Sequence, residues 1–320
     1  LLDTINSEKS KGAILPMPLI KILNKKETIF TFMQLLHWLP KFLLRHKIID
    51  FLCSVGLQER VIKINFNNGS MVMIDLTDPE PRNIFIRGEF EPHFFRIANA
   101  FIPESGIFFD LGANVGFCSF GLVPSRPKAR FHLFEASPQM INLLNQSIDL
   151  HKIHSFSLTQ CCLSDKEGNT SFHLSVKQSG QSHVATSCEQ GTQISNLLLD
   201  QYCEDHKIKH IDFAKIDVEG QEVPTLIGWK KSLSQQNIKA LYVEIIPENQ
   251  ARYGYETNTS LVLLESYGYK LFLCKPEDFE NFGNKVETLT FEGGSISVSS
   301  FSAKDYPPSF ATDVLAIATQ

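Results

Sequence analysis

The stretch FDLGANVGFCSF, residues 109–120, joins two apolar segments through a turn that carries two glycines. Asp110 stands just before Gly112, and Gly116 follows four residues after that glycine. A strand, a glycine turn and a helix in this order are typical of an α/β sheet that binds a ligand beyond the carboxyl ends of its strands. We therefore expect Gly112 and Gly116 to let the backbone approach a ligand, and the helix to offer free N–H groups.

From about residue 105 onward, strand-like and helix-like segments alternate. The expected strands are GIFFDL, ARFHLFE, SFSLTQC, IDFAKID, ALYVEI, YKLFLC and TDVLAIAT. The segment SPQMINLLNQSIDL is expected to be a helix, with Ser137 as its N-cap and Pro138 at its first position. This alternation predicts an α/β fold with a mostly parallel sheet covered by helices on both faces.

Two further regions precede this core. Residues 1–60 are expected to form a helical, mildly basic N-terminal extension. Residues 61–104 are expected to contain a hairpin, turning at Asn67-Asn68-Gly69, and a helix that leads into the domain at 105–320. The aromatic and basic segment 28–55 is expected either to pack as an accessory helix or to contact a membrane surface peripherally.

Composition narrows the class of protein. The chain has 320 residues, 43% of them hydrophobic and 20% charged, which is typical of a folded globular protein. A net charge of −5 argues against nucleic acid as a partner. The 25 Phe residues indicate an aromatic core or an apolar binding surface. The seven cysteines include no C-x-x-C pair, and we expect a reducing, cytoplasmic location.

The acid before the glycine turn separates two classes of cofactor. Dinucleotides prefer G-x-G-x-x-G, whereas this turn has G-x-x-x-G, and Asp110 would repel a pyrophosphate. S-adenosyl-L-methionine carries an ammonium and a sulfonium group and no phosphate, so Asp110 is expected to accept from its methionine end, directly or through water. Glu135, about 25 residues further on, ends the next strand at the spacing of a ribose-binding acid. NAD shares that ribose contact, so Glu135 indicates a nucleoside without choosing between the two.

Five segments taken in order resemble the FkbM family of S-adenosylmethionine-dependent methyltransferases: FDLGANVGFCSF, FEASP, CLSDKEGNTSFHL, FAKIDVEGQEVPTLIGW and YVEI. The resemblance covers about residues 84–319. It implies a class I methyltransferase (Rossmann-like) sheet of seven strands whose last strand, TDVLAIAT, is antiparallel. It also implies O-methylation of a hydroxyl of a glycan, glycolipid or secondary metabolite. The alternative is a nucleoside-binding scaffold that keeps this fold without catalysis.

Three side chains are candidates for catalysis. Asp217 ends the strand IDFAKID and Glu219 follows in the turn DVEG, so each carboxylate can raise the pKa of the other. One of them could remove the acceptor proton while the other fixes geometry or binds cofactor; capping of the following helix is the structural alternative. His183, in the polar loop SGQSHVATS, is a rival base that the resemblance places over the cofactor cleft. No metal ligand set is expected.

The expected cofactor site combines the motif residues with two positions that only the resemblance supplies, Glu91 ahead of the first strand and Leu163 near the adenine. The full set is Asp110, Gly112, Ala113, Asn114, Gly116, Glu135, Ala136, Leu163 and Glu91.

Overall fold

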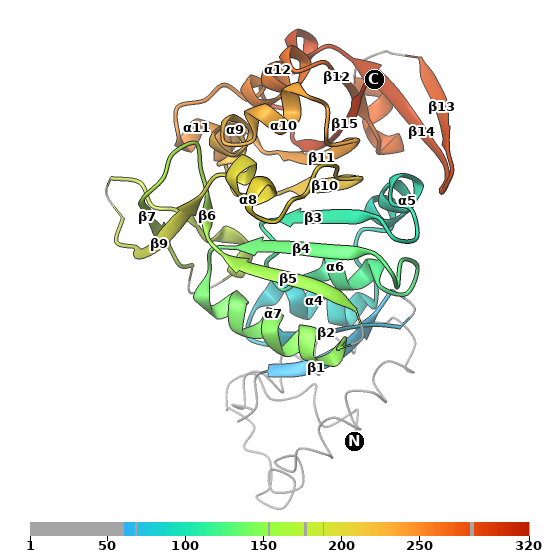
Figure 1. Ribbon diagram of the computed structural model, residues 1–320. Coiled ribbons are helices and arrows are strands. Elements are labelled where there is room, and N and C mark those ends of the chain that lie inside the picture. Colours follow the sequence, from blue (N-terminus) through green and yellow to red (C-terminus); the bar gives the residue numbers. More distant parts are fainter. Residues whose placement is uncertain are drawn as a thin grey trace, which may run out of the picture. The chain divides into compact units, whose positions relative to one another are not determined.

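The computed structural model describes residues 61–67, 69–152, 154–175, 178–187, 189–281 and 285–319 (Figure 1). The predicted helical extension at 1–60 and the predicted membrane contact at 28–55 lie outside the described residues. Within the described part of the chain, no helix has the length and apolar character needed to cross a bilayer.

A central sheet of nine strands organises the fold, in the order β13-β14-β12-β15-β11-β10-β3-β4-β5. The strands β3, β4, β5, β10 and β11 are mutually parallel, and β15 is antiparallel to both of its neighbours, β11 and β12. The bounds are β3 (Ile107–Leu111), β4 (Arg130–Glu135), β5 (Ser155–Gln160), β10 (Phe213–Ile216), β11 (Ala240–Ile245), β12 (Tyr269–Leu273), β13 (Val286–Phe291), β14 (Gly294–Phe301) and β15 (Thr312–Ala318).

All seven predicted strands are present as neighbours in this sheet, and the antiparallel last strand is confirmed. The predicted number of seven is wrong for the sheet as a whole, because the hairpin of β13 and β14 extends it beyond β12. These two strands are rich in Ser and Thr, and the exposure of β13 alternates along its length. They therefore lack the apolar run that marks the inner strands.

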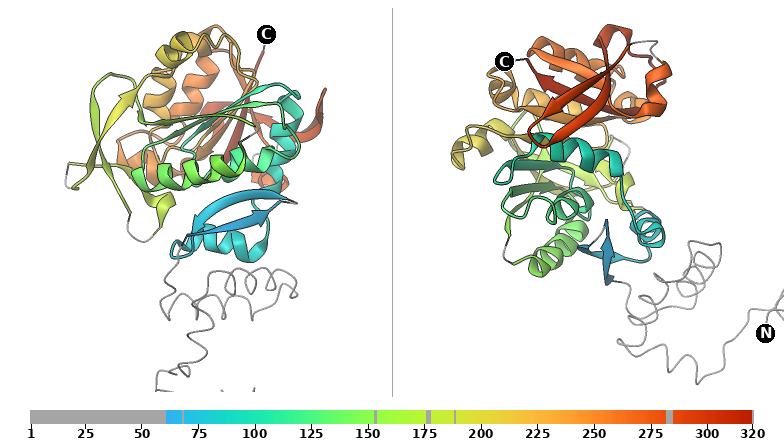
Figure 2. Two further views of the ribbon diagram at one scale, coloured as in Figure 1. Left: turned by 60° about the horizontal axis from the view of Figure 1, so that its bottom comes forward. Right: turned by 90° about the vertical axis from the view of Figure 1, so that its right-hand side faces the viewer.

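Helices cover both faces of the sheet (Figures 1 and 2). One face is covered by α5 (Pro92–Phe101), α6 (Phe117–Leu122) and α7 (Pro138–Leu150). The other face packs against α8 (Leu199–Asp205), α9 (Glu222–Ile227), α10 (Lys230–Ser234) and α12 (Thr259–Ser266). Ser137 caps α7 and Pro138 begins it, as predicted.

The phenylalanines build the core. Successive residues of a strand face opposite sides of a sheet, so Phe108 and Phe109 serve different faces. The ring centroid of Phe108 lies 6.0 Å from that of Phe94 in α5, whereas Phe109 stacks on Trp229 at 5.7 Å. All four side chains are fully buried, so the high Phe content here fills both helix–sheet interfaces.

Smaller elements surround the sheet. β1 (Val61–Phe66) and β2 (Ser70–Asp75) form the predicted hairpin, followed by α4 (Pro79–Arg87). A second sheet, in the order β6-β9-β7-β8, is inserted between β5 and α8. The remaining bounds are β6 (Cys162–Leu163), β7 (Asn169–His173), β8 (His183–Val184), β9 (Thr192–Leu197), α11 (Pro247–Arg252), and the 3-10 turns η1 (Ser179–Gln181), η2 (Pro276–Asn281) and η3 (Ala303–Asp305).

Candidate active site

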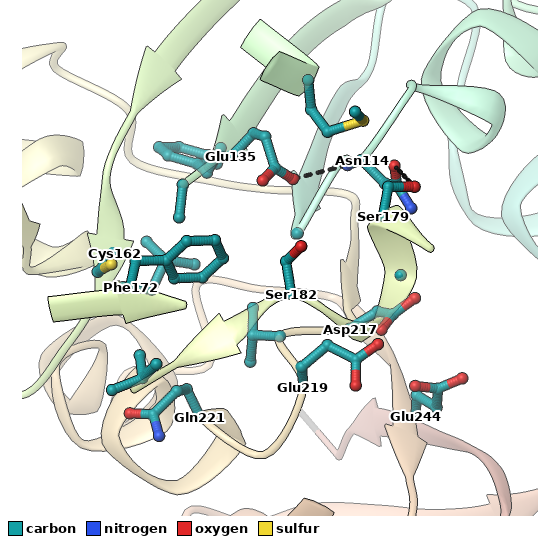
Figure 3. Close-up of a pocket in the computed structure, with 18 of the residues that line it drawn as sticks. Asn114, Glu135, Cys162, Phe172, Ser179, Ser182, Asp217, Glu219, Gln221 and Glu244 are labelled. Atoms are coloured by element: carbon teal, nitrogen blue, oxygen red, sulfur yellow. Dashed lines mark hydrogen bonds between the residues drawn. The ribbon is translucent and has the colours of Figure 1, made fainter. Parts of the chain in front are cut away.

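A cavity of about 270 Å³ lies at the carboxyl edge of the central sheet (Figure 3). It is formed where β3, β4, β10 and β11 end, and the segment 178–184 borders it from the side of the small sheet. Its lining is Glu80, Gly112, Asn114, Phe134, Glu135, Ala136, Met140, Cys161, Cys162, Leu163, Phe172, Gln178, Ser179, Gly180, Ser182, Val184, Asp217, Val218, Glu219, Gln221, Glu244 and Ile246. The expected position of the ligand and this cavity therefore coincide.

The two motif glycines are required by packing within the protein. Gly112 has φ +83°, and a Cβ built on it would lie 1.7 Å from the carbonyl oxygen of Asp217 at the end of the neighbouring strand. A Cβ on Gly116 would lie 2.4 Å from the ring of Phe120 and 2.8 Å from Leu144 in α7. Gly112 also lines the cavity, as predicted for a backbone that approaches a ligand, whereas Gly116 lies off the lining, so its contact with a ligand stays a prediction.

Asp110 lies beneath the turn instead of facing the cavity. It is 1% exposed and is absent from the lining, because strand alternation points it toward α6. Ser119 of α6 donates its hydroxyl to Asp110 Oδ2 at 2.6 Å. Burial raises the pKa of Asp110, opposed by the charge of Lys215 and the Ser119 hydrogen bond. The structure therefore does not bring Asp110 into direct reach of a ligand, and neighbouring Ala113 is likewise buried off the lining.

Glu135 does line the cavity, at the end of β4. The backbone N–H of Asn114 donates to Oε2 at 2.8 Å and that of Ser137 to Oε1 at 2.7 Å, and the carboxylate reaches toward Asn114 in Figure 3. Burial raises the pKa of Glu135, while these N–H groups oppose the rise. A carboxylate oxygen can accept more than one hydrogen bond, so Glu135 can still accept from a ligand hydroxyl.

The turn after β10 brings both predicted acids, Asp217 and Glu219, onto the lining. Lys215 Nζ lies 2.5 Å from Asp217 Oδ2, and its side chain is 8% exposed. Burial alone would raise the pKa of Asp217, but the Lys215 charge and hydrogen bonds from Lys215 and Glu244 bring it below its ordinary value. Burial, with the nearby charge of Asp217, raises the pKa of Glu244 well above its ordinary value, so the pKa values of these two acids are shifted in opposite directions.

The pKa of Glu219 is shifted in the opposite direction from that of Asp217. Burial raises its pKa to about 8, and the negative charge of Asp217 adds to the rise. A hydrogen bond from Asn249 Nδ2 to Glu219 Oε2, at 2.8 Å, works against it. The two adjacent acids are therefore separated in pKa by their surroundings, which is a common feature of acid and base pairs in active sites.

His183 faces away from the cavity. Ser182 and Val184 on either side of it line the cavity, and alternation along β8 turns the imidazole to the other side. Nδ1 donates to the carbonyl of Gln181 at 2.8 Å, and Nε2 lies 3.2 Å from both carboxylate oxygens of Glu189. The prediction of His183 as the base therefore lacks support in this geometry.

Hydrogen bonds to Asp78, Asn114 and Tyr253 hold the segment 178–184 beside the cavity. Ser179 N–H donates to Asp78 Oδ2 at 2.9 Å, and Ser179 Oγ donates to Asn114 Oδ1 at 2.9 Å. The other oxygen of Asp78 accepts from Glu80 N–H at 3.1 Å and so caps α4. Tyr253 OH donates to the carbonyl of Val184 at 2.7 Å. Glu80 and this segment are site residues that the motifs did not reveal.

Of the three remaining predicted positions, two line the cavity and one does not. Ala136 and Leu163 line the cavity. Glu91 does not: it is the N-cap residue of α5, with φ 33°, and it interacts electrostatically with Lys215 from outside the lining.

A doubly wound sheet with a cavity at its carboxyl edge is typical of α/β proteins that bind a ligand at that edge. The Methyltransferase FkbM domain matches residues 110–271, just over half of the chain. The chain therefore belongs to the FkbM methyltransferase family, as the motifs predicted, and S-adenosyl-L-methionine is its cofactor.

Curated relatives agree with this class. The chain is 21% identical over 196 residues to Methyltransferase 1 of Beauveria bassiana, covering 55% of this chain and 76% of that protein. It is 24% identical over 171 residues to Methyltransferase sdnD of Sordaria araneosa, covering 43% of this chain and 65% of that protein, slightly under two thirds of its length.

Solved structures are more distant. A precorrin-6y C5,15-methyltransferase from Geobacter metallireducens is 11% identical with a TM-score of 0.38, covering 72% of this chain and 89% of that one. An O-methyltransferase from Bacillus cereus in complex with SAH is 11% identical with a TM-score of 0.36, covering 72% and 82%. Because these TM-scores are low, the assignment to the family rests on the match to the FkbM domain alone.

Proposed function

We propose that this protein is an O-methyltransferase whose acceptor is a hydroxyl of a glycan, glycolipid or secondary metabolite. When bound, S-adenosyl-L-methionine supplies an electrophilic methyl group, which passes to the hydroxyl oxygen while the electron pair of the broken C–S bond stays on sulfur. A neutral hydroxyl is a poor nucleophile, so its proton has to be removed as the C–O bond forms. The residues around the cavity suit both the binding of the cofactor and the removal of this proton.

The lining suits a cofactor that is cationic and carries a nucleoside. Among the described residues that line the cavity, five are acids and none is Lys, Arg or His. A pyrophosphate would meet no positively charged side chain on this lining, whereas the acids that are ionised would attract a sulfonium and an ammonium group. The Glu135 carboxylate lines the cavity and can accept from a ribose hydroxyl. An adenine ring would be received by the apolar part of the lining: Ala136, Met140, Leu163, Phe172 and Val218.

A single observation carries the reaction type: Glu219 lines the same cavity as Glu135 and has a pKa of about 8. A base works best when its pKa lies near the working pH. Asp217 is less suited, because its hydrogen bonds with Lys215 and Glu244 occupy the carboxylate and its pKa is low. We assign the role of the base to Glu219, and we infer that Asp217 holds the turn in place.

The test is transfer of a labelled methyl group from S-adenosyl-L-methionine to a library of glycans, glycolipids and polyols, with mass spectrometry of the products. An O-methyl ether is expected, and its label survives mild alkali, whereas a methyl ester would be hydrolysed. Glu219→Gln should lose at least about 100-fold in rate, in the range of general base catalysis. It should keep S-adenosylhomocysteine binding, measured by calorimetry.

Glu248→Gln is the matched control, because Glu248 is an exposed acid in the neighbouring helix α11 that does not line the cavity. It should transfer methyl groups at the parent rate. Alkali-labile products only, or transfer to nitrogen, would overturn the assignment of a hydroxyl acceptor.

A further inference from the structure

The helix α11 (Pro247–Arg252) holds the turn that carries Glu219. Asn249 Nδ2 donates to Glu219 Oε2 at 2.8 Å, and Arg252 Nη1 donates to the backbone carbonyl of Glu219 at 3.3 Å. A third residue of the helix, Gln250, donates its side-chain amide to Glu222 in the same turn region. These three contacts come from about one turn of a short helix, and they involve the side chain and backbone of Glu219 and the side chain of Glu222.

The backbone of the turn shows how close this contact is. Glu219 has φ 54° although it is not a glycine, and Gly220 follows with φ 98°. A Cβ on Gly220 would lie 2.4 Å from the backbone oxygen of Asn249, so only glycine lets the turn approach the helix this closely. Asn249 itself is 8% exposed. A left-handed non-glycine residue persists only where its surroundings fix it, and such residues cluster at functional sites.

The charged groups that face Glu219 come from several elements. Asp217 and Glu222 on its own turn raise its pKa, and Arg252 of α11 lowers it. Glu80 of α4 and Glu244 of β11 share the cavity with it. No described residue of the segment 178–184 adds a charge that faces the cavity, because His183 points away. The hydrogen bond from Asn249 is therefore one of few contacts that favour the ionised carboxylate.

We propose that Asn249 is a positioning residue for Glu219: its amide fixes Oε2, and Oε1 is thereby left for the proton of the acceptor hydroxyl. The inference rests on the proposed function, since it takes Glu219 as the base. Asn249 does not line the cavity, so it acts on the reaction only through Glu219. Removing its amide leaves a carboxylate that is less easily ionised and free to rotate.

The experiment compares the parent protein with Asn249→Ala and with the isosteric Asn249→Asp, which keeps the side-chain volume if the alanine variant fails to fold. The first readout is the titration of the Glu219 carboxyl carbon by NMR in cofactor-free protein labelled at glutamate, assigned by its loss in Glu219→Gln. The midpoint should lie near pH 8 in the parent. It should rise by about one pH unit or more in Asn249→Ala, through loss of a hydrogen bond to a charged group, and in Asn249→Asp, where a second carboxyl shares the site.

The second readout is the pH profile of kcat/KM. The rising limb should move to higher pH with the NMR midpoint, giving about a tenfold loss at pH 7 that is largely recovered above pH 9. The matched control Glu248→Ala, on the exposed side of the same helix, should leave both readouts at the parent values.

An unmoved NMR midpoint in folded variants, or an equal loss of rate at every pH, would overturn the positioning role and leave the base assignment intact. Full methyl transfer by Glu219→Gln would overturn the base assignment itself, whatever the NMR midpoints show.

Discussion

Replacing Lys215 by Met removes the buried cation on which the acids around the cavity depend. Lys215 is 6% exposed, and its Nζ lies 2.5 Å from Asp217 Oδ2, whose side chain is 27% exposed. Burial alone would lower the pKa of Lys215, but Asp217, Glu91 and Asp110 hold it well above its ordinary value, so it stays charged. Breaking a buried ion pair from one side costs about 3–5 kcal/mol. Because Asp217 keeps some contact with water, we expect a loss of about 3 kcal/mol.

The loss of unfolding free energy in Lys215→Met should increase with pH. In the parent protein the pKa of Asp217 is below its unfolded value, so its contribution to stability is present above the unfolded pKa and is lost as pH falls through the folded pKa. Without Lys215, burial raises the pKa of Asp217, and the charged carboxylate becomes a cost that acid relieves. The difference in unfolding free energy between parent and Lys215→Met should therefore be larger at pH 8 than at pH 5.

Equilibrium unfolding in urea at the two pH values measures this, with Lys215→Met/Asp217→Asn completing a double-mutant cycle. The double variant should be more stable at pH 8 than Lys215→Met alone, because no unpaired charge remains. A deficit below about 1 kcal/mol that is equal at both pH values would refute the reasoning, since it would mean that the pair behaves like an exposed surface salt bridge.

Three other outcomes follow from the site. Glu135→Gln should weaken S-adenosylhomocysteine binding by about 10- to 100-fold in calorimetry, because the amide places a donor against the backbone N–H of Asn114 or Ser137; affinity equal to that of the parent would contradict the assigned ribose contact. The kcat/KM of the parent should rise with pH through about pH 8, where Glu219 loses its proton, and a rate that stays flat from pH 6 to 9 would remove Glu219 as the base. His183→Gln should keep the turnover number within about threefold, since its imidazole lies outside the cavity; a loss comparable to that of Glu219→Gln would restore His183 as a catalytic candidate.

The sequence predicted the inner strands β3, β4, β10 and β11 well because they are buried on both faces and contain apolar runs. The hairpin β13–β14 could not be predicted in this way, because its Ser and Thr side chains carry no continuous apolar signal. In the small sheet that borders the cavity, β6 and β8 have two residues each, too few for an apolar pattern to be read from the sequence.

Within the site, the sequence predicted the residues that end strands, since the carboxyl ends of parallel strands meet at one edge. Glu135, Asp217 and Glu219 all line the cavity. Motif spacing did not predict where the Asp110 side chain points: it lies one residue before the end of β3 and turns toward α6, so its contact with the cofactor, directly or through water, stays a prediction. Glu80 reaches the cavity from a helix far away in the chain, and Asp78 ahead of it indicates only a helix start.

The near-contact between Gly112 and the carbonyl of Asp217 has a practical consequence for engineering this protein. The glycine turn and the turn that bears Glu219, the base in our proposal, pack directly against each other, so we expect substitutions in either turn to disturb both. Libraries intended to change the acceptor should leave both turns untouched and diversify residues 178–184, which border the cavity through a few side-chain contacts and main-chain hydrogen bonds. Selectivity could then be altered without rebuilding the catalytic machinery.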